Sequence, residues 1–323
     1  MKKNIPLLLL VLLGLNTMIY AAKWRVNNIS GVNADFTTAQ AVNDSSSVLT
    51  GDTVYFEGSL NSYGDLTLSK RLVIIGPGYF LGENDSTQAN LLPAILGTVV
   101  INPGAENSVI TGMTTSTFYV RCNNILLKRD NLGQTNIGDA GAASNIFILQ
   151  CWIYRVYITT GSQNVIIKNN IFFNAGAWDW NVQNEDGSAA LYINNIFQTN
   201  CFFHDCEIRN NIFTGPCGTA REGIELNGSC ITTNNISACG SLPAGSGNQT
   251  SIDMTTVFVY TGSSDGQYRL LPGSPAIGAG YDGVDCGVFG GSNSYVLSGL
   301  PTVPAIWKLD IDGTTVILKA KSH

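Results

Sequence analysis

Charged residues are scarce in this 323-residue chain. They make up 12% of the sequence, against about 25% in an average soluble domain. Histidine is scarcer still, with two residues, one of which is the final residue His323. The net charge of -6 removes the attraction to phosphate on which nucleic-acid binding depends. Cysteine and histidine pairs at zinc-ligand spacing are also absent. We therefore expect no nucleic-acid partner and no zinc site of that kind.

Long apolar runs are also missing, except at the N-terminus. There Lys2 and Lys3 precede an uncharged apolar run, residues 5–15, and the small residues Ala21 and Ala22 follow it. This pattern predicts a signal peptide over residues 1–22, because the run is too short to span a bilayer. Its removal takes the net charge from -6 to -8. We expect a protein without a membrane span that is secreted or held at the cell surface, in the extracellular or periplasmic space.

What the chain has in abundance is asparagine, with 32 residues, and part of it recurs in one phrase. The strong copies are Lys168–Phe172, Ile193–Phe197, Arg209–Phe213 and Thr233–Ser237, and the weaker ones Thr111–Met113, Asp130–Leu132 and Cys151–Ile153. The apolar residue after each Asn pair marks a register: Met113, Leu132, Ile153, Ile171, Ile196, Ile212 and Ile236. Their variable spacing, near 20 residues, predicts a solenoid whose coils share a strand and a turn but differ in loop length.

Alternation identifies the coils as β. Residues before the phrase alternate apolar and polar, as in Cys206–Arg209, which is the period of a strand with one buried face. The chain is therefore predicted to be all-β, a single-stranded parallel β-helix over residues 51–299. Residues 23–50 would form an N-terminal strand and a cap helix that starts at Asp35 and carries Phe36, Ala39 and Val42. Residues 300–323 would form a capping hairpin around Asp312 and Gly313.

Two columns of the coil follow from this register. Asparagine tolerates the left-handed backbone of a sharp bend and bonds nearby backbone groups. We therefore expect a stacked amide ladder of Asn131, Asn170, Asn195, Asn211 and Asn235. The same alignment places Val165, Ala190, Cys206 and Cys230 in one inward column. The two cysteines are interpreted as core thiols, with a disulfide between them as the alternative and no more than two disulfides in the chain.

The chain resembles the pectate-lyase-like superfamily of right-handed parallel β-helix proteins, in its exported bacterial form. The Asn-Asn-Ile-Phe coils, the segment Asp35–Phe56, and the segment Tyr268–Gly280 with its continuation Asp285–Gly287 carry this likeness. It implies right-handed winding. It does not imply one activity, because the fold hosts lyases, hydrolases, esterases, tailspikes and adhesins. The Asn-Thr-Asp, Asp-Asp, Gly-His-Gly and Arg-Ile-Lys phrases of polygalacturonase-like hydrolases are absent.

Coil length suggests where a ligand would bind. The coil from Ile196 to Ile212 is the shortest and lies between the two longest, so loops on either side would leave a trough above it. One wall would carry Trp178, Asp179, Trp180, Glu185 and Asp186, and the other Arg221, Glu222 and Glu225. The floor would hold His204, Asp205, Glu207 and Arg209, with Lys168 one position along the outward column. Aromatic rings beside carboxylates suit sugars, although a loop tryptophan also commonly packs its own loop.

Three functions remain open. The first is binding of an extended polysaccharide or cell-surface glycan by a monomer, through Trp178, Trp180, His204, Glu207 and Glu222. The second is a polysaccharide lyase working by calcium-assisted β-elimination, or a glycoside hydrolase. In the lyase, Asp179, Glu185 and Asp186 would hold calcium and Lys168, Arg209 or Arg221 would remove the proton. The third is a structural role in the envelope or as an adhesin-like surface protein.

Overall fold

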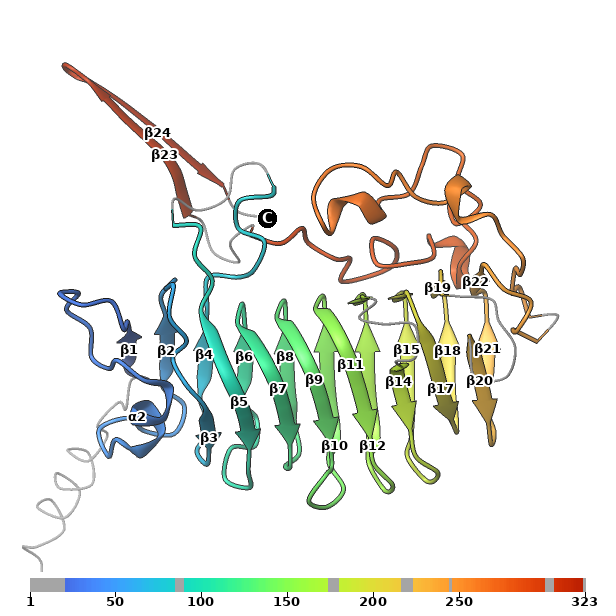
Figure 1. Ribbon diagram of the computed structural model, residues 1–323, viewed down its shortest axis with the longest axis horizontal. Coiled ribbons are helices and arrows are strands. Elements are labelled where there is room, and N and C mark those ends of the chain that lie inside the picture. Colours follow the sequence, from blue (N-terminus) through green and yellow to red (C-terminus); the bar gives the residue numbers. More distant parts are fainter. Residues whose placement is uncertain are drawn as a thin grey trace, which may run out of the picture.

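A computed structural model (Figure 1) shows a parallel β-solenoid of about eight turns. It describes residues 21–84, 90–173, 180–215, 223–243, 246–299 and 305–321, and in the last range the side chains of residues 310–319. The predicted signal peptide, apart from Ala21 and Ala22, lies outside the described residues. In the described part, no helix has both the length and the apolar character needed to cross a bilayer.

One long side of the solenoid is a ten-stranded parallel sheet. Each coil adds one strand, and neighbouring strands pair in register. In order along the rod the strands are β1 (Lys23–Val26), β2 (Thr53–Phe56), β4 (Val73–Ile75), β6 (Val109–Thr111), β8 (Ile125–Lys128), β10 (Ser144–Leu149), β12 (Gln163–Lys168), β15 (Ala190–Ile193), β18 (Cys206–Arg209) and β21 (Ile231–Thr233).

The second sheet has twelve strands and divides along the rod. Its first strands are β3 (Leu66–Leu68), β5 (Ile95–Ile101), β7 (Thr114–Val120), β9 (Asn131–Ile137) and β11 (Trp152–Ile158). Beyond β11 the sheet continues as two branches. One is made of β13 (Ile171–Phe172), β16 (Ile196–Phe197), β19 (Ile212–Phe213) and β22 (Ile236–Ser237), and the other of β14 (Trp180–Asn184), β17 (Asn200–His204) and β20 (Ile224–Asn227).

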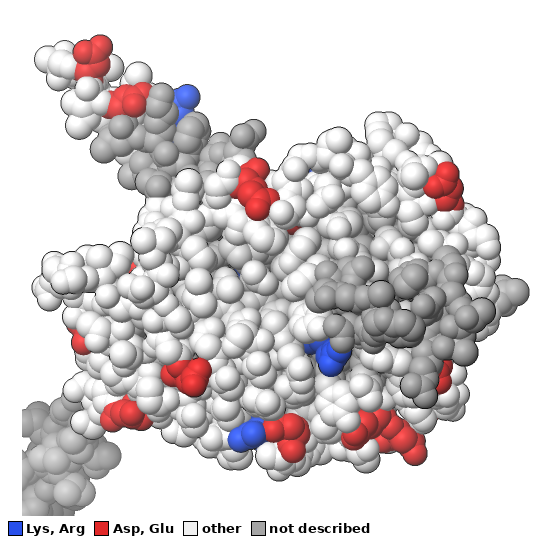
Figure 2. Space-filling model, viewed as in Figure 1, with Lys and Arg blue, Asp and Glu red and all other residues white. Residues whose placement is uncertain are grey.

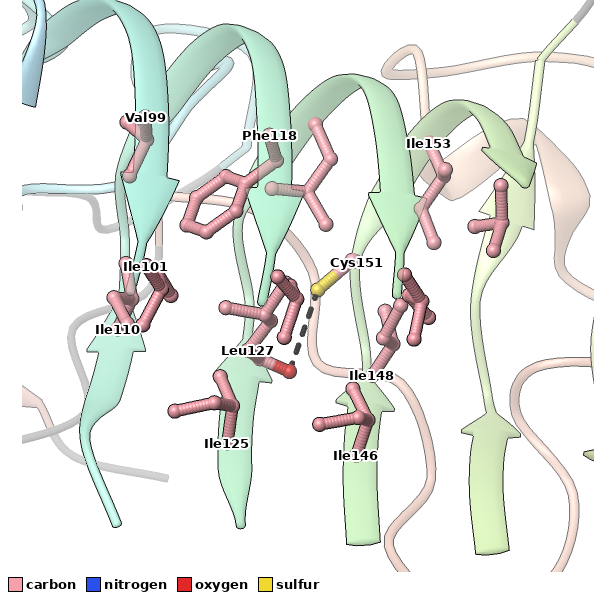
Figure 3. Close-up of a cluster of buried hydrophobic side chains, with 14 of the residues drawn as sticks. Val99, Ile101, Ile110, Phe118, Ile125, Leu127, Ile146, Ile148, Cys151 and Ile153 are labelled. Carbon is pink, nitrogen blue, oxygen red and sulfur yellow. Dashed lines mark hydrogen bonds between the residues drawn. The ribbon is translucent and has the colours of Figure 1, made fainter. Parts of the chain in front are cut away.

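The core lies inside the coils. Alternate residues of each strand point inward and stack on the equivalent residues of the next coil, as Figure 3 shows for the column of Ile125 and Ile146. Farther along, Phe172, Phe197 and Phe213 stack with centroids 4.7 and 5.0 Å apart. The predicted column of Val165, Ala190 and Cys206 is confirmed by strand pairing. Apolar burial of this kind stabilises the fold by roughly 25 cal/mol per Å².

The predicted register is right from Ile171 onward and one residue out before it. Asn131 pairs with Trp152, which pairs with Ile171. Leu132 and Ile153 are therefore in register with Phe172 and face inward with it. Asp130, not Asn131, occupies the ladder position, where its Oδ1 accepts a hydrogen bond from the Met113 amide, 2.8 Å. A slip of one residue moves every side chain to the opposite face of a strand.

The Asn pair performs two separate tasks at the bend. The first residue takes the left-handed backbone, with φ between 53° and 58° at Asn169, Asn194, Asn210 and Asn234. The second residue forms the predicted amide ladder. For example, the Asn195 Nδ2 donates to Asn211 Oδ1, 3.0 Å away, and to the Ile167 carbonyl, 2.9 Å away. In the two coils before Asn169 and Asn170, Arg129 and Gln150 take the left-handed position instead.

A return segment, residues 246–299, runs back along the rod over the Asn bends (Figure 1). Side chains of the left-handed positions donate to its backbone. Asn234 bonds the Ala279 carbonyl, Asn169 bonds Val288 and Gly290, and Gln150 bonds Asn293 and Ser294. Beneath it, the column Ile171, Ile196, Ile212 and Ile236 forms a second apolar cluster with return-segment residues such as Val257, Phe258, Cys286 and Val288. This outer core holds the segment on the solenoid.

The N-terminal end differs from the prediction in its helix. Helix α2 (Ala39–Asp44) has six residues and its N-cap is Thr38, whose hydroxyl accepts from the Ala41 amide. Asp35 instead accepts a hydrogen bond from the backbone of Arg25, 2.7 Å, because β1 passes beside it. Ala39 and Val42 are buried as expected. The result is one short helix packed against β3.

The C-terminal hairpin is formed by β23 (Ala305–Asp312) and β24 (Thr315–Lys321), which pair antiparallel as predicted. Its role as a cap of the last coil is not observed: Figure 1 draws it projecting away from the coils, and among the described strands it pairs with no other. Ile311 and Val316 lie opposite each other and are 70% and 61% exposed. The return segment, and not the hairpin, covers part of the solenoid.

Candidate functional site

The structure divides the predicted site residues between two sheets. Lys168, Glu207 and Arg209 are on the ten-stranded sheet, whereas Trp180 and His204 are on the twelve-stranded sheet. Glu185 and Asp186 lie in the turn between β14 and β15, and Glu225 is on β20. Trp178, Asp179, Arg221 and Glu222 lie outside the described residues. The described candidates therefore do not share one trough.

The two described candidate bases have local partners on their own sheet. Lys168 Nζ donates to Ser292 Oγ of the return segment, 2.8 Å away. Partial burial, helped by the nearby Arg209 charge, lowers the pKa of the Lys168 ammonium. Arg209 pairs with Glu207, 3.1 Å. Arg209 ends strand β18 and Asp205 precedes it, so at about 3.3 Å per residue their backbones are on the order of 13 Å apart.

The return segment covers the shortest coil at Ile196 and Ile212, the two residues that bound this coil. Ile196 and Ile212 are fully buried under the return segment, and Gly287 approaches so closely that a Cβ there would lie 2.7 Å from Ile212 Cδ1. Gly287 also has a positive φ of 83°, which glycine adopts without strain. The open surface is instead the outward face of the twelve-stranded sheet, to which this coil contributes β17.

That face carries one row of polar and aromatic side chains at a single register. Every member except Asn136 is at least partly exposed. The row consists of Tyr119, Asn136, Tyr157, Gln183, Phe202 and Glu225, each paired with the next. Trp180 adds a further ring, edge-on to Phe202 with centroids 5.4 Å apart. Arg155 donates to the Trp180 carbonyl, 3.1 Å, and so fixes the start of β14.

The face of the molecule shown in Figure 2 carries few charged side chains, and its acids and bases are scattered. Because few charges lie on this face, a ligand there would be recognised by hydrogen bonding and stacking and not by long-range attraction.

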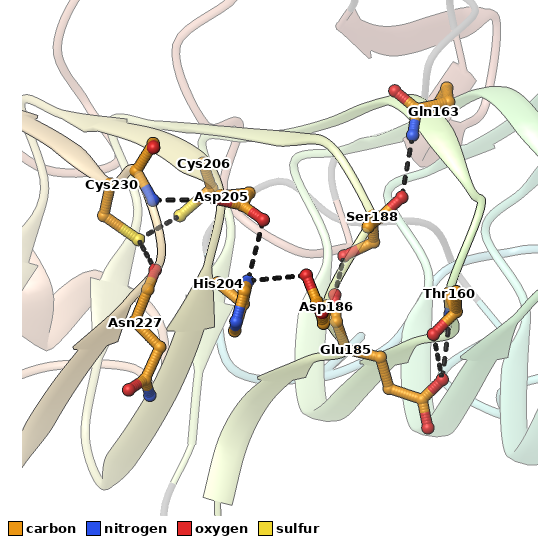
Figure 4. Close-up of polar contacts among 12 residues, drawn as sticks. Thr160, Gln163, Glu185, Asp186, Ser188, His204, Asp205, Cys206, Asn227 and Cys230 are labelled. Atoms are coloured by element: carbon orange, nitrogen blue, oxygen red, sulfur yellow. Dashed lines mark hydrogen bonds and ion pairs between the residues drawn. The ribbon is translucent and has the colours of Figure 1, made fainter.

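Carboxylates and one imidazole gather at the end of this row (Figure 4). His204 Nδ1 lies 2.9 Å from Asp205 Oδ2 and 3.7 Å from Asp186 Oδ1. The Ser229 amide donates to Asp205, 2.7 Å, and this bond is the main reason that the pKa of Asp205 falls below its usual value. Asp186 is 87% exposed. The three residues therefore form a surface cluster fixed mainly through Asp205.

Glu185 is turned away from this cluster. It bonds the hydroxyl of Tyr157 and accepts from the Thr160 amide, 2.8 Å. The Tyr157 hydroxyl, ahead of the Thr160 amide, lowers the pKa of Glu185, while Glu185 raises the pKa of Tyr157 to about 12. Glu185 consequently orders the outward row and does not join Asp186 as a ligand.

The cluster of Asp186, His204 and Asp205 is poorly suited to the calcium ion that the lyase hypothesis requires. Calcium takes six to eight oxygen ligands. Among the described residues the cluster offers three donor atoms within 4.8 Å of one another, from Asp186, His204 and Asp205, and one of them is an imidazole nitrogen. A mixed nitrogen and carboxylate set suits first-row transition ions better. No step of a calcium-assisted reaction is therefore assigned to these groups.

A hollow at the other end of the rod was not predicted from the sequence. It measures about 700 Å³ and is lined by residues that include Lys23, Arg25, Tyr55 and Glu57. Arg25 is bonded to Glu57, 2.7 Å, and to the Asn33 carbonyl, 3.2 Å, so part of its guanidinium is engaged within the chain. Alternation in β2 could have placed Tyr55 outward, but the hollow itself depends on Gly76 and Pro77, which are remote in sequence.

Comparison of the chain with family models, curated proteins and solved structures finds no match in any of the three.

Proposed function

We propose that this chain is an exported, right-handed parallel β-helix protein of the pectate-lyase-like type that binds an extended polysaccharide or cell-surface glycan. The binding surface would be the outward face of the twelve-stranded sheet, and the protein would act as a monomer. The observation that carries the proposal is the single-register row from Tyr119 to Glu225, with Trp180 beside it.

The row matches the chemistry of a sugar chain. Aromatic rings cover the apolar faces of pyranoses, and amides and carboxylates bond their hydroxyls. Strands in a sheet repeat about every 4.8 Å, so the row offers a contact at short, regular intervals along the rod. The strands that present it are packed on a continuous core, and a rigid surface loses little entropy when it binds an extended chain.

Export and winding rest on general arguments. Cys239 is disulfide-bonded, which is typical of proteins in oxidising compartments and agrees with the predicted signal peptide. Parallel strands of one sheet joined by a crossover are right-handed in about 98% of cases, which supports right-handed winding.

Binding is favoured over cleavage by the placement of the two described candidate bases. Lys168 and Arg209 are on the other sheet, with Ser292 and Glu207 as partners, and Asp186, His204 and Asp205 fit calcium poorly. The lyase, the hydrolase and the envelope or adhesin-like role are therefore outcomes of the test and not the proposal.

The test compares two surface variants with a control on a panel of neutral and uronate polysaccharides. Retardation in glycan-containing gels measures binding, and ultraviolet absorbance of unsaturated products measures lyase activity. We expect retardation without products. Gln183→Ala and Trp180→Ala should weaken binding by roughly tenfold each, the loss of one good contact, whereas Tyr55→Ala in the remote hollow should not.

Gln183→Ala separates a loss of binding from a loss of folding, because the Gln183 side chain is partly exposed and its removal should leave the fold intact. Its melting temperature should equal that of the parent. Equal retardation of all three variants and the parent would refute the proposed surface. New absorbance would support a lyase, and absence of both signals would support the structural role.

A further inference from the structure

Two cysteine thiols meet near the last coil. Cys206 begins β18, and Cys230 precedes β21, the strand that pairs with it. The pairing of Glu207 with Ile231 makes Cys206 and Cys230 the preceding pair of the same register. Their sulfur atoms lie 3.5 Å apart (Figure 4).

This geometry suits a disulfide. Paired strands lie about 4.8 Å apart, which falls within the 4.4–6.8 Å that disulfides span between Cα atoms. Both side chains are on the inward side of their strands, since Cys206 is in register with the inward Ala190. Closing the remaining gap between the sulfurs requires side-chain rotation and no exchange of strand partners.

The two thiols are also chemically unequal. Cys206 is buried, 5% exposed, while Cys230 is partly exposed. The contact between the two sulfurs lowers the pKa of Cys230 to about 6, and the same contact together with burial raises the pKa of Cys206. The more accessible sulfur is thus the one that ionises more readily, and a thiolate is the form that attacks disulfides.

The other buried thiols lack this arrangement. Burial raises the pKa of Cys201 well above its usual value, and it raises the pKa of Cys122 to about 11 and that of Cys286 to about 12. Cys239 shows that the chain does take disulfide bonds.

We propose that Cys206 and Cys230 are a redox site that closes to a disulfide joining adjacent coils. The oxidant is a small disulfide of the glutathione class. The Cys230 thiolate attacks it, forming a mixed disulfide and releasing one thiolate. Cys206 then attacks the Cys230 sulfur, and the second small thiolate leaves. The proton of Cys206 passes to a released thiolate. In sum, two protein thiols lose two electrons, and one small disulfide is reduced to two thiols.

The bond would fix the coil beside the outward row. Asp205 precedes Cys206, and it already bonds the Ser229 amide next to Cys230. The disulfide would reinforce that contact covalently and close a loop in which the two cysteines are 24 positions apart. Loop closure restricts the unfolded chain, so oxidised protein should melt at a higher temperature. The proposal does not depend on glycan binding.

The test uses the full chain after treatment with oxidised glutathione. Remaining thiols are alkylated in denaturant and the protein is digested for mass spectrometry. We expect a peptide pair linked through Cys206 and Cys230, and two fewer alkylated cysteines than in the same protein before oxidation. Cys206→Ser should instead accumulate glutathione on Cys230, because the second step is blocked. Cys122→Ser is the matched control and should still form the link.

The melting temperature provides a second, independent test of the disulfide. A phosphine reductant also opens the disulfide of Cys239, so the quantity of interest is the difference between variants. Reduction should lower the melting temperature of the parent and of Cys122→Ser by roughly 5 °C more than that of Cys206→Ser. Full alkylation of both cysteines after oxidation would overturn the proposal, and so would a link from either one to Cys201.

Discussion

The solenoid has asparagine rows at two of its bends, and the two rows lie in opposite surroundings. At one bend, Asn170, Asn195, Asn211 and Asn235 are fully buried and bond one another along the rod. At the other, Asn124, Asn145 and Asn164 are exposed, though Asn145 bonds Asn124, 2.9 Å, and Asn164 bonds Asn145, 2.7 Å.

The difference shows that burial decides how much a side-chain ladder contributes to the stability of the fold. When a side chain of the exposed row is removed, water replaces its hydrogen bonds, so these bonds contribute little to the free energy of unfolding. The buried row lies between the inner core and the outer core under the return segment, where a lost partner leaves a polar group without water. The hydrogen-bond geometry is similar in both rows, but the energetic consequence is not.

Asn195→Ala should have the largest effect. Asn195 accepts from the Asn170 backbone and side chain and donates to Asn211 and to the Ile167 carbonyl. Its removal leaves several buried groups unpaired at about 1–3 kcal/mol each, so we expect the free energy of unfolding to fall by about 3 kcal/mol. Urea denaturation followed by circular dichroism measures this. An unchanged midpoint would contradict the importance of the buried row.

Asp130→Asn should strengthen the buried row. Burial raises the pKa of the Asp130 carboxyl well above its usual value, and its Oδ2 has no hydrogen-bond partner in the described part of the chain. An amide there would donate as the other ladder residues do. We expect about 2 kcal/mol of added stability near neutral pH, measured by the same denaturation.

The pH dependence of this variant sharpens the comparison. Because the folded pKa is raised, the contribution of Asp130 is complete below the unfolded pKa of about 3.9 and is lost as pH rises through the folded pKa. The parent should therefore weaken, relative to Asp130→Asn, as pH rises above about 4. Parallel stability curves for the two proteins between pH 4 and 8 would show that Asp130 is not a neutral acid.

Asn169→Gly tests the link to the return segment. Glycine keeps the left-handed backbone at this position, where φ is 55°, so the change removes the bonds to the Val288 and Gly290 carbonyls and little else. We expect a loss of about 1 kcal/mol and faster amide hydrogen exchange in residues 285–291. Unaltered exchange there would mean that the outer apolar cluster alone holds the segment.

Asn145→Gly should have the smallest effect. It too keeps a left-handed backbone, with φ of 59°, and it removes the contacts to Asn124 and Asn164 in the exposed row. We expect a change within about 0.5 kcal/mol, as for most surface substitutions. A loss as large as that of Asn195→Ala would erase the distinction between the two rows.

The strands and the later coils could be predicted because their signals are local. Alternation in Cys206–Arg209 and the Asn pairs after β12, β15 and β18 reflect burial and bend geometry within a few residues. The same reasoning failed before Ile171, where Asp130 and Cys151 occupy the ladder position. An Asp or a Cys at this position does not predict that the residue before it adopts a left-handed backbone.

The candidate site was predicted only in fragments. Trp180 and His204 do lie on one exposed face, but the row of Tyr157, Gln183 and Phe202 could not be recognised without knowing which strands are neighbours. Loop length pointed to a gap over the short coil. The return segment lies there instead, because an apolar column such as Ile196 and Ile212 has the same pattern whether it faces the interior or a covering segment.

The sequence by itself determined that the chain coils as parallel β-strands, where its best-marked bends fall and which residues alternate inward, since these depend on local backbone preference and on period-two burial. Only the tertiary structure decided the pairing of coils, the path of the return segment and the meeting of Cys206 with Cys230. Those depend on contacts between residues far apart in the chain, and no local pattern specifies which distant partner will cover a given surface.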